Sequence, residues 1–415
     1  MNYKITSEIG PLRFVVTHKP GYEHSFITPS HLIEKIEKNN KILDNPDYLL
    51  FDDIIQIKKA QDEHNQLYKI LHYFTDGNSY EFTDMLTYLL DDKIIRKNLI
   101  KECANLEIKK YENEIDENKL FNINSNLLVK VLLSGYLNDK KIFTHPIPNL
   151  IFTRDIAVCV GHTILITWSK KDVRKRENIL SKFVFYNFKE FKDMKIYDFH
   201  EKHPNLSIEG GDILIFDKKR VCIGISERTP IDSIEKLTKL FFDEEFETVY
   251  AIDIPKRRAL MHLDTIFTRI SENEVLVYPP MLDNKISNKI YIYKNNSKPT
   301  ISKDNLINVL KKDGLKLTVI NCGGNSDIMQ KREQWTDGAN SFALDSGKII
   351  SYDCNEFTLK ELNKSGYEII SSQDYLKDYK NFNNSNKKFA ITLKCSELVR
   401  GRGGPRCLTM PIFRI

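Results

Sequence analysis

A long stretch near the N-terminus carries apolar residues at helical spacing. No proline occurs between Pro46 and Pro146, and only Gly77 and Gly135 interrupt a sequence rich in Leu, Ile, Lys, Glu and Asn. Apolar side chains at intervals of three, four and one form a stripe along one face of a helix. The pattern predicts a small helical bundle over residues 71–145, with a stripe made of Met85, Leu86, Leu89, Leu90, Ile94 and Ile95.

On either side of this block, short β-branched runs come in pairs that a tight turn separates. The clearest unit predicts a strand over 213–216, a turn over 217–219 and a return strand over 221–225. Pro230 then begins a helix that is expected to run to about residue 242, since proline is well suited to the start of a helix.

A second unit repeats this order of elements. It predicts strands over 342–344 and 348–352 and a helix over 358–363. A chain longer than about 250–300 residues usually divides into several cores, but a repeated ββα module can instead surround one axis. We therefore expect an α/β fold of repeated modules over 1–70 and 146–415, with the helical block 71–145 inserted.

Charge and cysteine content exclude several classes of protein. The 415 residues include 62 basic and 57 acidic side chains, and the net charge of +5 does not indicate a nucleic-acid partner. Seven scattered cysteines without CxxC spacing argue against a disulfide framework and a structural zinc site, and favour a reducing compartment such as the cytoplasm.

No segment indicates a membrane partner or secretion. The chain begins without the apolar run of a signal peptide. The most apolar internal stretch, 156–168, is interrupted by Gly161, His162 and Thr163 and is too short to cross a bilayer as a helix. It is interpreted as two strands that a turn joins.

A cysteine follows a loop rich in glycine and arginine at 400–406. Glycines allow the backbone to approach a ligand closely, Pro405 stiffens the loop, and nearby guanidinium groups favour a thiolate at Cys407. The segment alone leaves three interpretations open: a reactive cysteine, a buried structural cysteine, or a basic turn that contacts nucleic acid. The last is the weakest, because no aromatic residue interrupts the run and Phe413 lies beyond it.

Three further segments carry acids or a histidine. If 261–268 is a strand, its alternation places His262 and Asp264 on one face. Asp155 follows an arginine at the end of a predicted strand, and Glu209 precedes a Gly-Gly turn. Taken singly, each segment has an ordinary structural interpretation as an ion pair or a strand end.

Together, these residues predict a site for a cation. One nucleophile and one histidine are accompanied by more carboxylates than a neutral substrate needs, and a guanidinium pairs bidentately with carboxylates. In such a site Cys407 would attack the guanidinium carbon. His262 would donate a proton to the leaving amine and then take one from water, while Glu209 orients it or shares in the proton transfer.

Five motifs in the chain resemble those of the arginine deiminase family: FTRD at 152–155, EGGD at 209–212, MHLDTIFT at 261–268, REQWTDGAN at 332–340 and RGRGGPRCLTMP at 400–411. The segments 7–12 and 50–54 resemble that family too, so the likeness extends from end to end. The resemblance implies a five-bladed α/β propeller of ββαβ modules, the pentein fold, with an inserted helical domain. It also implies hydrolysis of L-arginine to L-citrulline and ammonia through an amidino-thioether on Cys407, without a metal or organic cofactor, in a dimer or tetramer.

The resemblance also implies roles for individual residues. Asp155 and Asp264 match the acids that bind the guanidinium, and Glu209 and His262 match the acid and base partners. The substrate-binding residues that it implies are the carboxylate ligands Arg174, Arg228 and Asn149, Phe152 beside the methylene chain, and Gly401 and Arg402 on the loop before the cysteine.

Three positions depart from the family pattern, which commonly has proline at Ile156, methionine at Leu408 and a basic residue at Cys354. None of these positions is assigned to the chemistry. Two alternatives stay open: an enzyme for another guanidino substrate, such as agmatine, methylated arginine or an amidinotransferase donor, and a catalytically silent arginine-binding homologue. Two arginines directed at a carboxylate argue against agmatine, and the presence of Cys407 and His262 argues against a silent homologue.

Overall fold

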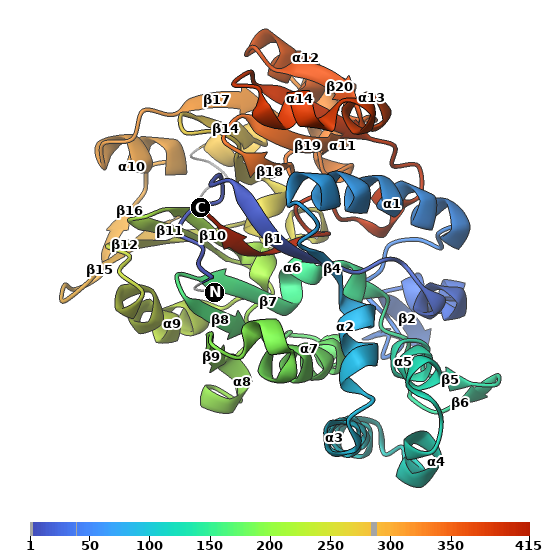
Figure 1. Cartoon of the computed structure of the whole chain (residues 1–415). Helices are drawn as coiled ribbons and strands as arrows, with labels where there is room; N and C mark the ends of the chain where they lie inside the picture. Colours follow the sequence, from blue (N-terminus) through green and yellow to red (C-terminus); the bar gives the residue numbers. More distant parts are fainter. Residues whose placement is uncertain (1–2, 39, 284–288) are drawn as a thin grey trace.

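The computed structural model describes residues 3–38, 40–283 and 289–415 (Figure 1). Within them, five sheets share one pattern, in which a middle strand pairs antiparallel with one neighbour and parallel with the other. With the middle strand named second, the sheets are β7 (Ala157–Val160), β8 (Thr163–Ile166) and β9 (Lys195–Asp198); β10 (Ile213–Asp217), β11 (Arg220–Ile225) and β12 (Thr248–Asp253); β13 (Phe267–Arg269), β14 (Glu274–Val277) and β17 (Thr318–Asn321); β18 (Phe342–Asp345), β19 (Lys348–Tyr352) and β21 (Phe389–Leu393); and β22 (Met410–Arg414), β1 (Leu12–Thr17) and β4 (Ser79–Glu81).

Two of these sheets are larger, and two hairpins stand apart. β15 (Ile290–Lys294) and β16 (Thr300–Ser302) extend the sheet of β12, and β20 (Glu368–Ser371) pairs in parallel with β21. The hairpins are β2 (Lys35–Lys38) with β3 (Lys41–Asp44) and β5 (Tyr136–Leu137) with β6 (Lys140–Lys141).

The fold is a mixed α/β fold, and the two repeated units are confirmed. β10 and β11 precede α9 (Ile231–Asp243), for which Pro230 is the N-cap residue. β18 and β19 precede α12 (Glu356–Lys364). The apolar stretch 156–168 contains the two expected strands, β7 and β8, which pair antiparallel. Among the described residues, no helix is both long and apolar enough to span a bilayer.

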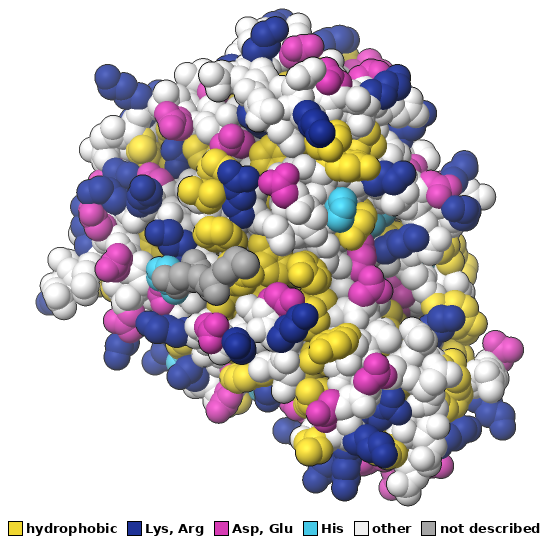
Figure 2. All heavy atoms as spheres, viewed as in Figure 1, with side chains coloured by type: hydrophobic (Ala, Val, Ile, Leu, Met, Phe, Trp, Pro, Cys, Tyr) yellow, Lys and Arg dark blue, Asp and Glu magenta, His cyan; other side chains and the backbone are white. Residues whose placement is uncertain are grey.

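Helices accompany the sheets outside the helical block. α7 (Lys175–Asn187) contacts β8 and β9, and α9 contacts β11 and β12. The others are α6 (Thr153–Ile156), α8 (Phe199–Lys202), α10 (Leu306–Lys312), α11 (Asp327–Trp335), α13 (Ser372–Lys377) and α14 (Tyr379–Asn384). Basic and acidic side chains are mixed over the face shown in Figure 2, as the near balance of charges in the sequence suggests.

The predicted block 71–145 contains α2 (Phe82–Leu89), α3 (Lys93–Tyr111), α4 (Glu117–Phe121) and α5 (Ser125–Ser134), whereas α1 (Ile57–Phe74) begins before it and overlaps it only by its last turn. Figure 1 shows α3, α4 and α5 gathered at the lower right, while α1 lies beside β1. Five of the six residues of the predicted stripe lie in or against one apolar cluster, but Ile94 does not. The stripe is not continuous along one helix, because Leu90 caps the end of α2 and the Asp92 carboxylate accepts hydrogen bonds from the first turn of α3. The new helix changes the phase of the pattern, and the side chain of Ile94 is 73% exposed.

The last strand of the chain lies against the first. β22 pairs antiparallel with β1, with Val16 opposite Met410, and β4 completes the sheet from within the predicted block 71–145. Cys407 lies three residues before β22. This sheet therefore places the cysteine among segments from the beginning of the chain.

Candidate active site

Cys407 is held by residues from three distant segments. Its backbone N–H donates to Asn340 Oδ1 at 3.0 Å, and its Sγ lies 3.7 Å from Asp264 Oδ2. Arg406 donates to the same Asp264 oxygen at 2.7 Å and pairs with Glu8 through two hydrogen bonds of 3.0 Å. All of these side chains are buried, so the arginine fixes the acid beside the sulfur.

The electrostatic surroundings of the Cys407 thiol differ from the sequence expectation. Burial raises its pKa well above the ordinary value, and the carboxylates of Asp264 and Asp155 raise it further. The guanidinium of Arg406 lowers the pKa, but by less than these effects. The expectation that the arginines alone would favour a thiolate is therefore wrong for the protein by itself.

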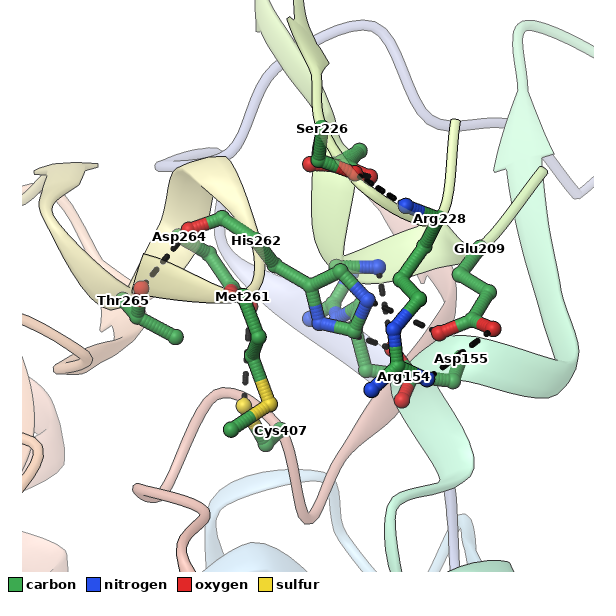
Figure 3. A network of polar contacts seen from close by, with 12 residues as sticks. Arg154, Asp155, Glu209, Ser226, Arg228, Met261, His262, Asp264, Thr265 and Cys407 are labelled. Carbon is green, nitrogen blue, oxygen red and sulfur yellow. Dashed lines mark hydrogen bonds and ion pairs between the residues drawn. The ribbon is translucent and has the colours of Figure 1, made fainter. Parts of the chain in front are cut away.

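His262 faces two carboxylates on the other side of the site. Its Nε2 lies 2.9 Å from Glu209 Oε2, and its Nδ1 lies 3.7 Å from Asp155 Oδ1. Burial lowers the pKa of His262, but Asp155 and the hydrogen bond to Glu209 outweigh burial and raise it to about 9. In Figure 3 the imidazole points toward Asp155 and Glu209, so it is held as an imidazolium at neutral pH.

The expected strand over 261–268 is wrong. His262 precedes a 3-10 turn over Leu263–Thr265, and β13 begins only at Phe267. The turn forms because Thr265 Oγ1 donates to the His262 carbonyl and Leu263 N–H donates to the carboxylate of Asp212. The site still contains both His262 and Asp264, although they are not alternate residues of one strand.

The segment before Asp155 also differs from the expected strand. A 3-10 turn covers Pro148–Ile151, and α6 follows directly. The chain turns twice, because Phe152 N–H donates to the Asn149 carbonyl and Asp155 N–H donates to that of Phe152. These turns bring three of the expected site residues close together in the fold.

The Gly-Gly pair after Glu209 allows close approach to the histidine. A Cβ at Gly211 would lie 2.6 Å from His262 Nδ1, and a Cβ at Gly210 would collide with the Arg154 carbonyl. Gly211 N–H donates to Asp155 Oδ1 at 3.1 Å. The predicted turn is confirmed as a 3-10 turn over Gly210–Asp212.

Two buried arginines neutralise the acids of the site. Arg174 Nη1 donates to Asp155 Oδ2 at 3.0 Å and to Glu209 Oε2 at 3.2 Å, and its Nε donates to Glu177 at 3.0 Å. Arg228 Nη1 lies 3.7 Å from Glu209 Oε1. These arginines outweigh the effect of burial and hold the pKa of Glu209 well below its usual range.

Asn149 lies beside this pair. Its carbonyl accepts a hydrogen bond from Arg174 Nη2 at 3.4 Å, and its Nδ2 donates to the Leu49 carbonyl. Among the described residues, Asp155, Glu209 and His262 form the one cluster with the spacing of metal ligands. Because two guanidinium groups already pair with these acids, the electrostatics suit an organic cation of similar shape better than a divalent ion.

The loop before the cysteine packs against aromatic rings. A Cβ at Gly401 would lie 2.7 Å from the Phe51 ring, and a Cβ at Gly403 would collide with the Phe152 ring. Arg402 has a left-handed backbone with φ of 62°, and its guanidinium lies 3.8 Å from the centroid of Trp335. Its Nε and Nη1 are buried without a hydrogen-bond partner among the described residues.

The structure thus brings together the residues expected from the sequence and adds several that sequence reasoning missed. Glu8, Arg406, Asn340 and Asp212 position the cysteine, Asp264 or the histidine turn. Each lies inside a motif or segment quoted from the sequence. Their position in those segments was the signal in the sequence that could have identified them. It did not show which atoms of these residues make contact.

Comparisons with known proteins identify the family. A sequence model described as arginine deiminase matches residues 124–414. The arginine deiminase of Mycoplasma capricolum subsp. capricolum is 33% identical over 99% of this chain and 96% of its own, and that of Clostridium perfringens is 30% identical over 99% and 97%. SxtG, an amidinotransferase from Microseira wollei, has a similar fold, with a TM-score of 0.55 and 12% identity over 100% of this chain and 98% of its own. The chain belongs to the arginine deiminase family.

Proposed function

We propose that the protein hydrolyses L-arginine to L-citrulline and ammonia, with Cys407 as the nucleophile. The observation that supports this proposal is that acids of the site already bind a guanidinium group of the protein itself. Asp155 and Glu209 already bind a guanidinium, that of Arg174, and Asp264 lies beside the sulfur with 3.7 Å between Oδ2 and Sγ. A substrate guanidinium between Asp155 and Asp264 would have its carbon within reach of Cys407.

The substrate supplies the positive charge that would stabilise a Cys407 thiolate and that the protein alone does not provide. Two carboxylates and burial hold Cys407 as a thiol, and a bound guanidinium offsets the negative charge of those carboxylates. The thiolate therefore becomes favourable when the cation is in place. Because thiolate formation depends on substrate binding, the reactive thiolate forms only in the complex with substrate.

The proposed reaction has two stages. When the substrate binds, the Cys407 thiol releases its proton to solvent. The thiolate attacks the guanidinium carbon, and His262 donates its proton to the leaving nitrogen as the C–N bond breaks, which releases ammonia and leaves an amidino-thioether. The neutral His262 then takes a proton from water, whose oxygen attacks the same carbon. The C–S bond breaks, and citrulline leaves with Cys407 restored.

The amino-acid end of the substrate is assigned to a separate set of residues. Arg174 and Arg228 would bind its carboxylate, with Asn149 nearby, and Phe152 would pack against the methylene chain. Gly401 and Arg402 would complete the site from the loop. Since Arg174 pairs with Asp155 in the protein alone, binding of substrate to Asp155 exchanges one guanidinium for another.

We also propose that the five sheets form a five-bladed propeller. Their shared strand pattern and the pairing of β1 with β22 support this arrangement. The division into propeller segments 1–70 and 146–415 and a helical insertion at 71–145 stays a prediction. So do the dimer or tetramer and the cytoplasmic location.

The direct test supplies L-arginine and agmatine separately to the purified protein, without added metal. Citrulline, carbamoylputrescine and ammonia are assayed. Equal amounts of citrulline and ammonia from L-arginine alone are expected, because agmatine has no carboxylate for Arg174 and Arg228. If neither compound reacts while L-arginine raises the melting temperature, a silent binding homologue replaces the proposal.

A further inference from the structure

A second cysteine pair lies outside the candidate active site. Cys354 Sγ and Cys395 Sγ are 3.1 Å apart, and both thiols are free. All seven cysteines lie in the described part of the chain, and Cys354 is the exposed one among them. Cys395 is buried directly behind it. An oxidant from solution therefore reaches Cys354 before any other thiol, including that of Cys407.

The sheet explains why the two sulfurs meet. β19 and β21 are parallel neighbours, with Tyr352 opposite Leu393 at their carboxyl ends. Asp353 N–H donates to the Leu393 carbonyl at 3.0 Å and continues the pairing by one residue. Cys354 lies two positions after Tyr352, and Cys395 lies two positions after Leu393. The two segments therefore leave the sheet side by side. Neighbouring strands lie about 5 Å apart, and a disulfide needs Cα atoms about 4.4–6.8 Å apart.

The pair opens on a cavity that admits a small molecule. The cavity has a volume of about 400 Å³ and is lined by Cys354, Cys395 and residues of α1 and the strand ends. Lys59 and Lys394 contribute ammonium groups to its lining and Asp62, Glu63 and Asp353 contribute carboxylates, so the lining carries charges of both signs. The hydrogen bond to Cys354 and burial raise the pKa of Cys395, so Cys395 remains protonated until its partner has reacted.

We propose that Cys354 and Cys395 are a redox-active pair that forms a reversible disulfide by exchange with a low-molecular-weight disulfide, RSSR. The Cys354 thiolate attacks one sulfur of RSSR and releases RS⁻, which leaves a mixed disulfide. Cys395 then loses its proton and attacks Cys354 Sγ, and a second RS⁻ leaves. Two protein thiols are oxidised and RSSR is reduced to two thiols, so atoms and electrons balance. The proposal does not depend on the reaction assigned to Cys407.

The disulfide would fix the start of the segment that leads to the catalytic loop. Cys395 precedes Glu397 and Leu398, whose backbone N–H groups donate to the Glu63 carboxylate of α1 at 3.0 and 2.9 Å. The bond would join residues 41 positions apart. Closing a loop of this size restricts the unfolded chain, so the oxidised protein is expected to melt a few degrees higher.

The experiment exposes the reduced protein to oxidised glutathione and then alkylates the remaining thiols. Peptide mass spectrometry is expected to show a Cys354–Cys395 crosslink that dithiothreitol reverses, with Cys407 alkylated only after denaturation. The same crosslink is expected in Cys407→Ala, which removes the nucleophile. Cys354→Ser should form no crosslink and show no rise in melting temperature, whereas Cys395→Ser should stop at a glutathione adduct on Cys354.

Two results would overturn the proposal. One concerns the parent protein at a glutathione redox potential that oxidises ordinary vicinal thiols. The proposal fails if both cysteines are then still alkylated separately, or if Cys354 keeps its glutathione adduct. The other is an equal rise in melting temperature in Cys354→Ser. The exposed position of Cys354 makes this variant suitable even if Cys395→Ser fails to fold.

Discussion

Arg406 and Glu8 pair through two hydrogen bonds of 3.0 Å across 398 positions of sequence. The same guanidinium donates to Asp264, the carboxylate next to the Cys407 sulfur. Glu8 therefore helps to position Cys407, the proposed nucleophile, from the other end of the sequence. A defect at Glu8 is expected to affect both folding and the reaction.

Glu8→Gln should destabilise the protein, because it leaves the buried Arg406 without its charged partner. Breaking a buried ion pair costs about 3–5 kcal/mol. Burial raises the pKa of Glu8, but Arg406 outweighs it and lowers the pKa to about 2. The stabilisation from this depressed pKa is complete above about 4.5, the pKa of an unpaired glutamate, and is lost as pH falls toward about 2. Urea unfolding at pH 7 and pH 3 checks this: the difference between parent and variant should shrink at the lower pH.

His262 should impose an upper pH limit on activity. Its folded pKa is raised to about 9 from 6.5, so the imidazolium that is proposed to donate the proton is lost as pH rises through 9. The same shift contributes stability that is complete below 6.5 and disappears above about 9. A profile of kcat/KM against pH, with urea unfolding of parent and His262→Asn in parallel, tests both effects. A rate profile that stays flat from about pH 7 to 11 would contradict an imidazolium donor.

Cys407→Ser should lower citrulline formation by on the order of 10³-fold or more, because a serine hydroxyl is a far poorer nucleophile at neutral pH. The fold should persist, since the hydrogen bond from the backbone of residue 407 to Asn340 does not involve the sulfur. Circular dichroism and an arginine-dependent rise in melting temperature provide the controls. Activity near that of the parent protein would remove the nucleophile assignment.

Arg228→Gln should separate the two ends of the substrate. Loss of a charge-assisted hydrogen bond costs about 1.5–3 kcal/mol, which corresponds to a KM for L-arginine roughly 10–100-fold higher. Weak binding of agmatine, measured as competitive inhibition, should change much less. Arg220→Gln is a matched control, because Arg220 pairs with Asp217 and Asp313 away from the site. Equal losses for both ligands would exclude a carboxylate-binding role for Arg228.

Gly211→Ala should impair the reaction by displacing the histidine. An added Cβ would lie 2.6 Å from His262 Nδ1, which is closer than carbon and nitrogen approach without a bond. The expected result is a lower kcat and an altered alkaline limb of the pH profile, since the imidazole would lose its place between Asp155 and Glu209. An unchanged profile with parental kcat would show that the ring has room to move.

The sequence predicted the elements whose pattern is local. The strands on either side of the turn 217–219 follow from alternating apolar runs, and the helix after Pro230 follows from its first residue. The expected strand at 261–268 failed because its real conformation depends on the Asp212 carboxylate, 51 positions away. No periodicity within eight residues contains that information.

The candidate site shows the same division. Motifs located the groups to which the chemistry is assigned, but the pKa of Cys407 depends on which charges lie nearest after folding. Burial, Asp264 and Asp155 outweigh Arg406 there, although arginines dominate the adjacent sequence. Similarly, nothing in the sequence around Cys354 indicates that its sulfur meets that of Cys395.

The pairing of β1 with β22 also determines when the protein can become active during synthesis. A ribosome makes the six residues of β1 early, but the antiparallel partner of this strand follows only after almost 400 further residues. Until then one edge of β1 has no partner, and Glu8 has no Arg406. The nascent chain can complete other sheets in order, but Cys407 joins His262 and the acids of the candidate site only after β22 has been made.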